Sequence, residues 1–497
     1  MTSARQSTQI LSINMRPALS VTILLTLALL LPACAAPSGR PAGSAPASPP
    51  SPTSPTQPTP AAAAPAPRHV WRSDGYGWIV TLTGTQARTY EVTAISCLPE
   101  PTLDQIGQPS ADGTWAFGSK NVPTETLHWE QADRATLHLI GTAANVDLLP
   151  VPGLPASCSQ QVPNTPQQNF DIFWQTFSEN YNSFLRKKDV NWAASRAQFR
   201  PMVTDGTKPK ALFKILTDMI TPLGDSHAYI QGPGGDEFAG KRPGTRDEDE
   251  VSRQDADSEV DAHLHDLGVS NIQTFAHNRI AYADLPSGRG YLRITSFEDY
   301  KGSNTSSVDS SAELKQVLDT VFTQARVSAW KGLVIDVRFN TGGDDALGLQ
   351  VAARLTNTPY LAYQKQPRDD PNDPSKHGRL QAVTVTPAAA PRYTGPVALL
   401  TSDLTVSAGE TFTEALLARN PSPVRIGTAT QGVFSDDMSR LLPNGWSFTL
   451  GNEDYYAPGG KNYEGLGIPP NITEPVFTQA EKKEHLDSAL DAANPRD

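Results

Sequence analysis

Two segments of the chain each have the pattern of a buried strand, a short turn and a helix. In the first, the apolar run Gly332–Val337 is followed by the turn Arg338–Gly343 and by a helix predicted over Asp344–Leu355. In the second, the apolar run Val397–Leu400 leads into a helix that begins near Ser407. Such runs are typical of strands buried on both faces. Successive units of this kind place their turns at the same edge of one sheet, so the sequence predicts an α/β fold.

Ser407 falls at the junction of the second strand and its helix, where the positive end of the helix dipole lies. The amides that follow, starting with Ala408, have no partner within the helix and could bind a developing oxyanion. In the other turn, Gly342 and Gly343 would let backbone N–H groups approach a ligand closely. These features favour a serine nucleophile. Serine is also a common helix N-cap, so the position alone fits a structural role equally well.

The first residues of the chain have the pattern of an export signal. Residues 1–34 contain an apolar stretch too short for a comfortable membrane span, and it ends in Leu31-Pro-Ala-Cys34. This ending resembles the lipobox of bacterial lipoproteins, in which the cysteine is lipidated. It predicts an extracytoplasmic protein anchored to a membrane of the bacterial cell envelope through Cys34. The alternative is an ordinary secretory signal cut near Ala36. Residues 35–67, rich in Pro, Ala and Ser, are predicted to be an extended linker.

Residues 68–163 contain strand-like runs separated by turn residues and are predicted to form a small β-domain. Cys97 and Cys158 are expected to form a disulfide there, because an exported chain encounters oxidising conditions. No metal-ligand spacing accompanies these cysteines, and the sequence predicts neither a metal nor a cofactor. The net charge of −11, with no basic block, argues against nucleic acid as a partner.

Residues 164–232 are predicted to be a helical subdomain, with helices over Asn169–Tyr181, Trp192–Met202 and Pro209–Ile220. An aromatic stripe on the first helix is expected to pack in the core. His227 follows in a loop, which could carry it toward a cleft. A loop histidine is by itself more often structural or merely exposed.

Two further regions complete the chain. Residues 233–287 are charged and poor in apolar residues, and they are predicted to be an acidic, solvated insertion. Residues 288–480 are predicted to be the α/β domain. In addition to the two units described first, it is expected to contain a strand over Arg289–Phe297 and a helix over Ser311–Ala329.

Three motifs together resemble the C-terminal-processing, or tail-specific, serine peptidases, and the resemblance covers residues 168 to 475. The motifs are Asp336-Val-Arg-Phe-Asn-Thr-Gly-Gly343, Ser407-Ala-Gly-Glu410 and Asn462-Tyr-Glu-Gly-Leu-Gly-Ile-Pro-Pro-Asn471. One branch of the family uses a lysine as the base. Gln431 stands at that position here and cannot accept the serine proton, so a serine–lysine dyad is excluded.

The other branch includes the tricorn protease core and the repeats of interphotoreceptor retinoid-binding protein. It carries a histidine in a D-x-H motif and a glutamate in E-G-x-G, matched here by Asp225-Ser-His227 and Glu464. The resemblance implies a crotonase-like β/α spiral peptidase domain and an endopeptidase that acts on peptides or unfolded proteins. The site it implies consists of the nucleophile Ser407, the base His227, the orienting Glu464, the accessory Ser226, and oxyanion donors at Ala408 and at Gly342 or Gly343.

Two alternatives remain open at this stage. The retinoid-binding repeats share the fold without needing peptidase activity, so the chain could be a catalytically inactive binding domain. It could also be an α/β-hydrolase-type esterase in which His485 serves Ser407.

Overall fold

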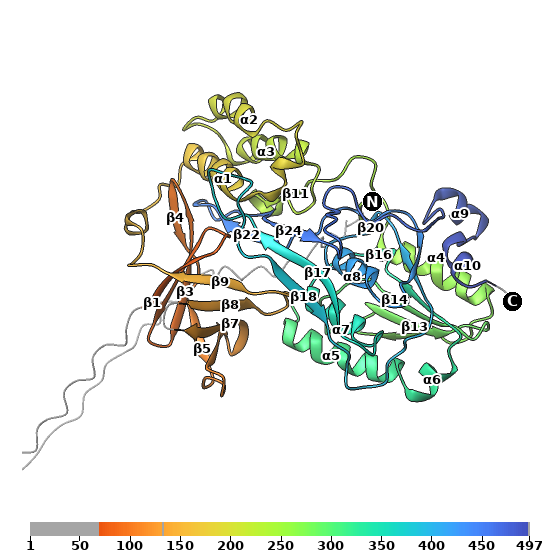
Figure 1. The fold of residues 1–497 in the computed structure, drawn as a ribbon. Coiled ribbons are helices and arrows are strands. Elements are labelled where there is room, and N and C mark those ends of the chain that lie inside the picture. Colours follow the sequence, from red (N-terminus) through yellow and green to blue (C-terminus); the bar gives the residue numbers. More distant parts are fainter. Residues whose placement is uncertain (1–68, 132–133, 496–497) are drawn as a thin grey trace, which may run out of the picture. The chain divides into compact units, whose positions relative to one another are not determined.

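The computed structural model describes residues 69–131 and 134–495 (Figure 1). Cys34, the signal segment and the linker lie outside these residues. The main sheet has the strand order β12-β13-β14-β15-β19-β21-β25. Its first two pairings are antiparallel, and the remaining four are parallel. The strands are β12 (Gln273–Phe275), β13 (Ile280–Asp284), β14 (Gly290–Ile294), β15 (Leu333–Asp336), β19 (Val397–Thr401), β21 (Val424–Gly427) and β25 (Ile472–Thr473).

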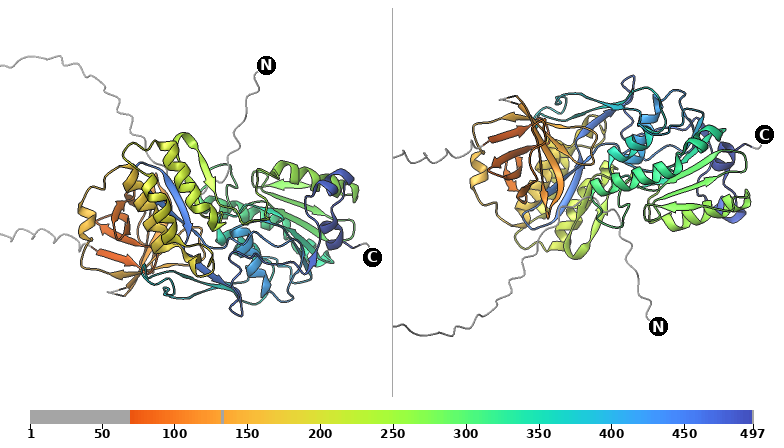
Figure 2. Two further views of the ribbon diagram at one scale, coloured as in Figure 1. Left: turned by 90° about the horizontal axis from the view of Figure 1, so that it is seen from above. Right: turned by 90° about the horizontal axis from the view of Figure 1, so that it is seen from below.

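Helices cover both faces of this sheet, because side chains alternate between two cores along each strand. Leu333 and Ile335 of β15 pack in one core with α5 (Ser307–Val321), α7 (Asp345–Ala352) and α8 (Ala408–Leu417). Val334 packs in the other core with α4 (Arg253–Asp266) and α10 (Ser488–Ala493). Figure 2 shows the dark blue C-terminal helices beside the green strands. The helix before α10 in the chain is α9 (Gln479–Glu484). None of the helices in the described part of the chain is both long and apolar enough to cross a membrane.

The helix predicted over Ser311–Ala329 is in fact two helices, α5 and α6 (Gln324–Ala329). Phe322 leaves the helical conformation and is fully buried in the main core. Thr323 then starts α6 by accepting a hydrogen bond from the backbone N–H of Arg326. The apolar periodicity continues across this break, which is why the sequence pattern alone did not reveal it.

The small β-domain is a closed eight-stranded barrel. The order β2-β1-β9-β8-β7-β6-β5-β3 is closed by pairing between β2 and β3, and β4 is attached to β3. The strands are β1 (His69–Ser73), β2 (Trp78–Thr83), β3 (Gln86–Thr93), β4 (Ser96–Pro99), β5 (Leu103–Ile106), β6 (Thr114–Ser119), β7 (Val122–Gln131), β8 (Arg134–Leu139) and β9 (Val146–Pro150). A disulfide joins Cys97 of β4 to Cys158 of the short helix η1 (Ala156–Ser159).

The helical segment lies where the sequence predicts it, as α1 (Pro166–Asn180), α2 (Trp192–Phe199) and α3 (Pro209–Ile220). The aromatic stripe of α1 is confirmed as core, since Phe170, Phe173 and Phe177 are fully buried. Their hydrophobic cluster also contains barrel residues and residues of β22 (Asp437–Leu441) and β23 (Ser447–Gly451). The barrel, the helical segment and part of the α/β region therefore share one core.

Residues 233–287 do not form a solvated insertion. They supply β11 (Glu237–Ala239), the helix α4 and two strands of the main sheet. Val260 and Leu264 of α4 are buried in the core. Arg246 lies at the centre of the charged run and donates hydrogen bonds to Asp403 and to the carbonyl of Val476. The charged composition reflects these ion pairs and the polar outer face of α4.

Three smaller sheets complete the fold. One has the order β11-β10-β23-β22, where β10 is Tyr229–Gln231. Another has the order β18-β17-β24, formed by Gln381–Val385, Tyr360–Pro367 and Glu453–Tyr456. The third pairs β16 (Phe339–Asn340) with β20 (Leu404–Thr405). The pairing of β16 with β20 holds the two predicted turns side by side.

Candidate active site

Ser407 occupies the position directly before α8, between β20 and the helix. Its backbone has φ 52° and ψ −121°, a combination that residues with side chains rarely adopt. Its N–H donates to the carbonyl of Val433 at 3.1 Å, and its carbonyl accepts from Glu410 and Thr411. The hydroxyl makes no capping bond, and the residue is half-buried. A strained, uncapped and accessible serine is suited to act as a nucleophile.

The glycine turn packs directly against Ser407. A Cβ placed on Gly342 would lie 2.7 Å from the Cβ of Ser407, and one on Gly343 would lie 2.5 Å from the carbonyl oxygen of Phe297. Both glycines have positive φ values, 92° and 122°. Glycine is therefore required at both positions by close approach and by conformation.

The structure distinguishes between the two glycines as oxyanion donors. The N–H of Gly342 already donates to Asn340 Oδ1 at 3.0 Å. Among the described residues, the N–H groups of Gly343 and Ala408 have no hydrogen-bond acceptor. Gly343 and Ala408 are therefore the two predicted donors that remain free to bind an oxyanion beside Ser407.

One segment, Gly432–Asp437, connects the elements of the site. Glu410, one turn into α8, accepts hydrogen bonds from the N–H groups of Gly432 and Val433 at 2.6 and 2.7 Å. Glu464 accepts from the N–H groups of Phe434 and Ser435, at 2.9 and 3.3 Å. We call residues 432–437 the clamped segment. Glu410 belongs to the Ser407-Ala-Gly-Glu410 motif, but its role becomes apparent only from these contacts.

His227 lies at the far end of the clamped segment. Its side chain is buried, and its Nδ1 lies 3.6 Å from Asp437 Oδ1. Its backbone N–H donates to Asp225 Oδ1 at 2.9 Å, and its carbonyl accepts from Thr449 Oγ1 at 2.8 Å. Burial lowers the pKa of His227, but the surrounding carboxylates, Asp437 foremost, outweigh this effect and raise its pKa overall.

Glu464 and Ser226 do not make the contacts with His227 that the sequence predicts. Glu464 bonds to backbone amides, and no hydrogen bond joins it to His227 in the described chain. Burial raises the pKa of Glu464 to about 7, with Asp225 adding to the effect. The hydroxyl of Ser226 is buried and has no hydrogen-bond partner among the described residues, so it bridges nothing in this structure.

None of the sequence motifs includes Asp437. It belongs to the acidic pair Asp436-Asp437, which interrupts an otherwise weakly polar stretch, and that interruption is the one signal that could have drawn attention to it. Burial raises the pKa of Asp437 to about 6. Within the described chain, no group of three or more His, Cys, Asp or Glu side chains is arranged to hold a metal ion.

Gln431 lies beside the nucleophile, because its N–H donates to the carbonyl of Thr405 at 3.0 Å. The residue at the family's lysine position therefore sits close to Ser407, but a carboxamide cannot take its proton. His485 is exposed at the end of α9. No contact in the described chain links it to Ser407, so the esterase alternative has no support in this arrangement.

The Asp336 and Arg338 positions of the glycine-turn motif are structural. Arg338 is buried and bonds to both oxygens of Asp336, and it also bonds to Asp487 at 2.6 and 2.9 Å. This triad ties the main sheet to the C-terminal helix α10, whose N-cap is Asp487.

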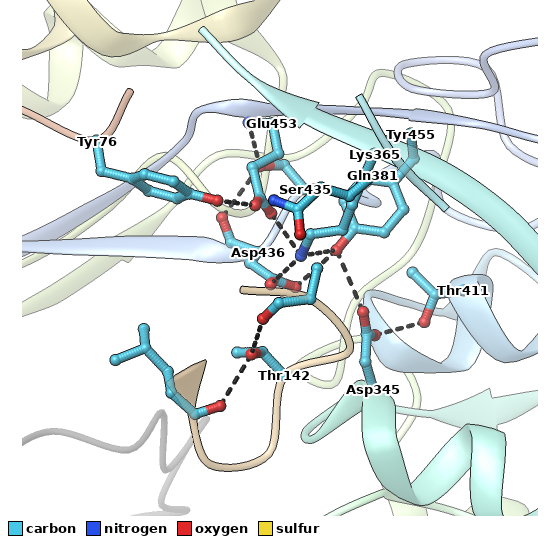
Figure 3. Close-up of polar contacts among 12 residues, drawn as sticks. Tyr76, Thr142, Asp345, Lys365, Gln381, Thr411, Ser435, Asp436, Glu453 and Tyr455 are labelled. Carbon is cyan, nitrogen blue, oxygen red and sulfur yellow. Dashed lines mark hydrogen bonds and ion pairs between the residues drawn. The ribbon is translucent and has the colours of Figure 1, made fainter. Parts of the chain in front are cut away.

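A second buried polar network lies next to the clamped segment (Figure 3). The Lys365 ammonium bonds to Asp436 at 2.6 Å and to Glu453 at 2.9 Å. The Tyr455 hydroxyl lies within hydrogen-bond distance of both Asp436 and Asp345, and Tyr76, from the barrel, donates to Glu453. We call these residues the Lys365 network. It fixes Asp436, which precedes Asp437 in the chain.

Two regions of the chain match models of known protein families. Residues 288–474 match the model of peptidase family S41, and residues 163–221 match that of the tricorn protease C1 domain. Residues 288–474 therefore form a domain of peptidase family S41. The protein is thus an S41 serine peptidase, and the resemblance given by the sequence motifs is confirmed. The S41 match excludes His227, which lies between the two matched regions.

Solved structures of similar fold include a peptidase-like protein of Parabacteroides merdae. It is 24% identical, with a TM-score of 0.54, and the alignment covers 67% of this chain and 96% of that one. Mature CPAF is 11% identical with a TM-score of 0.48, covering 65% and 94%. The tricorn protease is 14% identical with a TM-score of 0.42, covering 84% and 43%. Of these three, only the Parabacteroides structure bears on the fold. No curated protein sequence matches the chain.

Proposed function

We propose that this S41 peptidase is an extracytoplasmic, lipid-anchored serine endopeptidase that cleaves peptides or unfolded proteins, with Ser407 as nucleophile and His227 as base. The observation that carries the proposal is the clamped segment. One of its residues binds the N–H of Ser407, and another faces His227 at 3.6 Å. The segment thus joins a strained serine to a buried histidine whose pKa the surrounding carboxylates raise.

The proposed reaction follows from these roles. The Ser407 hydroxyl attacks the substrate carbonyl carbon while His227 takes its proton. The N–H groups of Ala408 and Gly343 bind the resulting oxyanion. His227 returns the proton to the leaving amine, and a water molecule, activated by the same histidine, then hydrolyses the acyl-enzyme.

Peptidase activity is tested with a dye-labelled denatured protein as substrate. Ser407→Ala and His227→Ala should each lose most activity, and the double variant should lose hardly more, since the residues act as one unit. His485→Ala and Gln431→Ala serve as folded controls and should be much milder. Full activity in folded His227→Ala would refute the histidine mechanism. Absence of cleavage together with failure of a fluorophosphonate to label Ser407 would favour an inactive binding domain.

The proposed location rests on the sequence of residues 1–34, with support from the Cys97–Cys158 disulfide, a feature typical of exported proteins. Cys34→Ser should release the protein from membranes, measured by fractionation of cells that express it. Recovery of the unmutated protein entirely in the soluble fraction would contradict the anchor.

A further inference from the structure

The carboxylate nearest the ring of His227 is Asp437. The two facing atoms, His227 Nδ1 and Asp437 Oδ1, are both buried, and neither has a hydrogen-bond partner within the described chain. We propose that Asp437 is the positioning residue for His227, holding Nδ1–H toward its carboxylate so that Nε2 is free to take the proton of Ser407. This inference rests on the proposed function and replaces Glu464 in the orienting role.

The small sheet β11-β10-β23-β22 fixes the two residues relative to each other. Asp437 is the first residue of β22 and pairs with Gly451 of β23. On its other edge, β23 pairs with β10, which begins two residues after His227. Thr449 of β23 holds the carbonyl of His227 at 2.8 Å. Both backbones are therefore anchored to one strand, and small side-chain movements decide whether the two groups bond.

The separation of 3.6 Å is too long for a hydrogen bond. It exceeds the usual N–H···O distance by roughly 0.7 Å. Catalytic hydrogen bonds are often long in the absence of substrate and shorten in the complex. Asp437 also lines a cavity of about 60 Å³, which leaves room for its side chain to move.

The other carboxylates that face His227 are already engaged. Asp225 accepts hydrogen bonds from the N–H of His227 and from the Tyr181 hydroxyl. Glu464 and Glu410 each accept hydrogen bonds from the clamped segment. Asp436 binds Lys365 and Tyr455. Asp437 differs from them, because its buried oxygen has no hydrogen-bond donor in the described residues other than the nearby imidazole. A buried carboxylate oxygen without a donor is costly, and a bond to Nδ1–H would remove that cost.

The charge of Asp437 should therefore act on His227 directly. Burial lowers the pKa of the imidazole, and Asp437, Asp225, Glu464 and Asp436 raise it. If Asp437 is made neutral, burial still lowers the pKa of His227, but one of the charges that raise it is lost. The pKa of His227 must therefore fall. His227 is active as a base when neutral, so the acid limb of the activity profile should move to lower pH. The maximal rate should fall as well, because the charged imidazolium loses its partner in the transition state.

The test compares Asp437→Asn with Glu464→Gln and Ser226→Ala in the full chain. Asp218→Asn, which removes an exposed carboxylate of α3, is the matched control. The His227 titration is followed by NMR of the histidine Cε1–H resonances and assigned with His227→Gln. The rate of labelling by a fluorophosphonate is measured across the same pH range.

Asp437→Asn should lower the titration midpoint of His227 and slow labelling by tenfold or more, an effect of the kind known for a triad aspartate. Asp437→Glu should recover part of the rate, which also guards against loss by misfolding. An unchanged titration in Asp437→Asn, with a shift in Glu464→Gln or Ser226→Ala, would overturn the inference. Because the titration needs no turnover, it remains decisive even if the protein proves inactive, whereas loss of the proposed function would appear only in labelling and cleavage.

Discussion

At the residue scale, Ser407 combines a positive φ with a ψ outside the left-handed helical region. Such a conformation costs about 1–3 kcal/mol for a residue with a Cβ. The bonds from Ser407 to Val433, Glu410 and Thr411 hold it there. The strain therefore belongs to the backbone position and not to the hydroxyl.

Ser407→Ala and Ser407→Gly should both abolish activity yet differ in stability. Alanine keeps the strain, whereas glycine relieves it, at some entropic cost in the unfolded state. We expect the glycine variant to be more stable by roughly 1 kcal/mol, measured by urea denaturation. Equal stabilities would show that the backbone is unstrained at this position.

Glu414, one turn beyond Glu410 on α8, is fully buried, and neither carboxylate oxygen has a hydrogen-bond partner in the described chain. Burial raises its pKa well above the ordinary value, and Asp345, Glu410 and Glu464 add to this. The stability that the neutral folded form confers is full below the unfolded pKa, about 4.3. It is lost as the pH rises through the folded value.

Glu414→Gln should therefore raise the melting temperature relative to the unmutated protein more at pH 8 than at pH 5. The buried amide has the same packing cost at both pH values, so the difference between them isolates the ionisation. Glu484→Gln on the exposed end of α9 is the control. Equal effects at the two pH values would mean that Glu414 is not held neutral.

At the scale of elements, the sequence predicts three features of the fold correctly. They are the two strand–turn–helix units, the three helices before His227 and the edge of the sheet that the two turns share. The units and the helices follow from apolar periodicity within a short window, and the shared edge follows from the topology of successive strand–turn–helix units. The break at Phe322, the core packing of α4 and the closed barrel were not predictable, because they depend on partners distant in the chain. The same holds for the site. Motifs pointed to Ser407 and His227 as candidates, but only tertiary packing shows that Asp437 lies 3.6 Å from the histidine.

Glu410 connects two elements, α8 and the clamped segment, through both carboxylate oxygens. The Glu410→Gln side chain can accept a hydrogen bond from only one of the two amide N–H groups. Each hydrogen bond to a charged group contributes about 1.5–3 kcal/mol to stability. We expect the variant to remain folded by circular dichroism but to react with a fluorophosphonate at least tenfold more slowly. Glu313→Gln on α5 is the control and should leave the rate unchanged. Unimpaired labelling of Glu410→Gln would show that the segment is held by other contacts.

At the scale of the molecule, the barrel contributes to the polar interior beside the active site. Tyr76 donates to Glu453 of the Lys365 network, and Arg440 donates to the carbonyl of Tyr76. The Tyr76 ring stacks on Trp78 at 5.0 Å. A single barrel turn thus satisfies a buried carboxylate of the α/β region.

Tyr76→Phe keeps the stacked ring but removes the donor to Glu453. The loss should destabilise the protein by about 1.5–3 kcal/mol, because a buried carboxylate oxygen is left without that bond. Tyr90→Phe, at a partly exposed tyrosine of the same barrel, should change stability little. The comparison is made by thermal melting, and equal shifts in the two variants would argue against the role of Tyr76.

The hydrophobic cluster that fills the barrel continues through α1 and α3 into β22 and β23. Separating any of these regions from the others would expose apolar surface on both parts, because residues such as Phe173, Leu137 and Phe448 lie in the same cluster. Heat should therefore disrupt them together, in one cooperative transition whose calorimetric enthalpy matches its van't Hoff enthalpy. The region that matches the S41 family, expressed alone, would lack most of this cluster and would leave the apolar side chains of β22 and β23 without their partners.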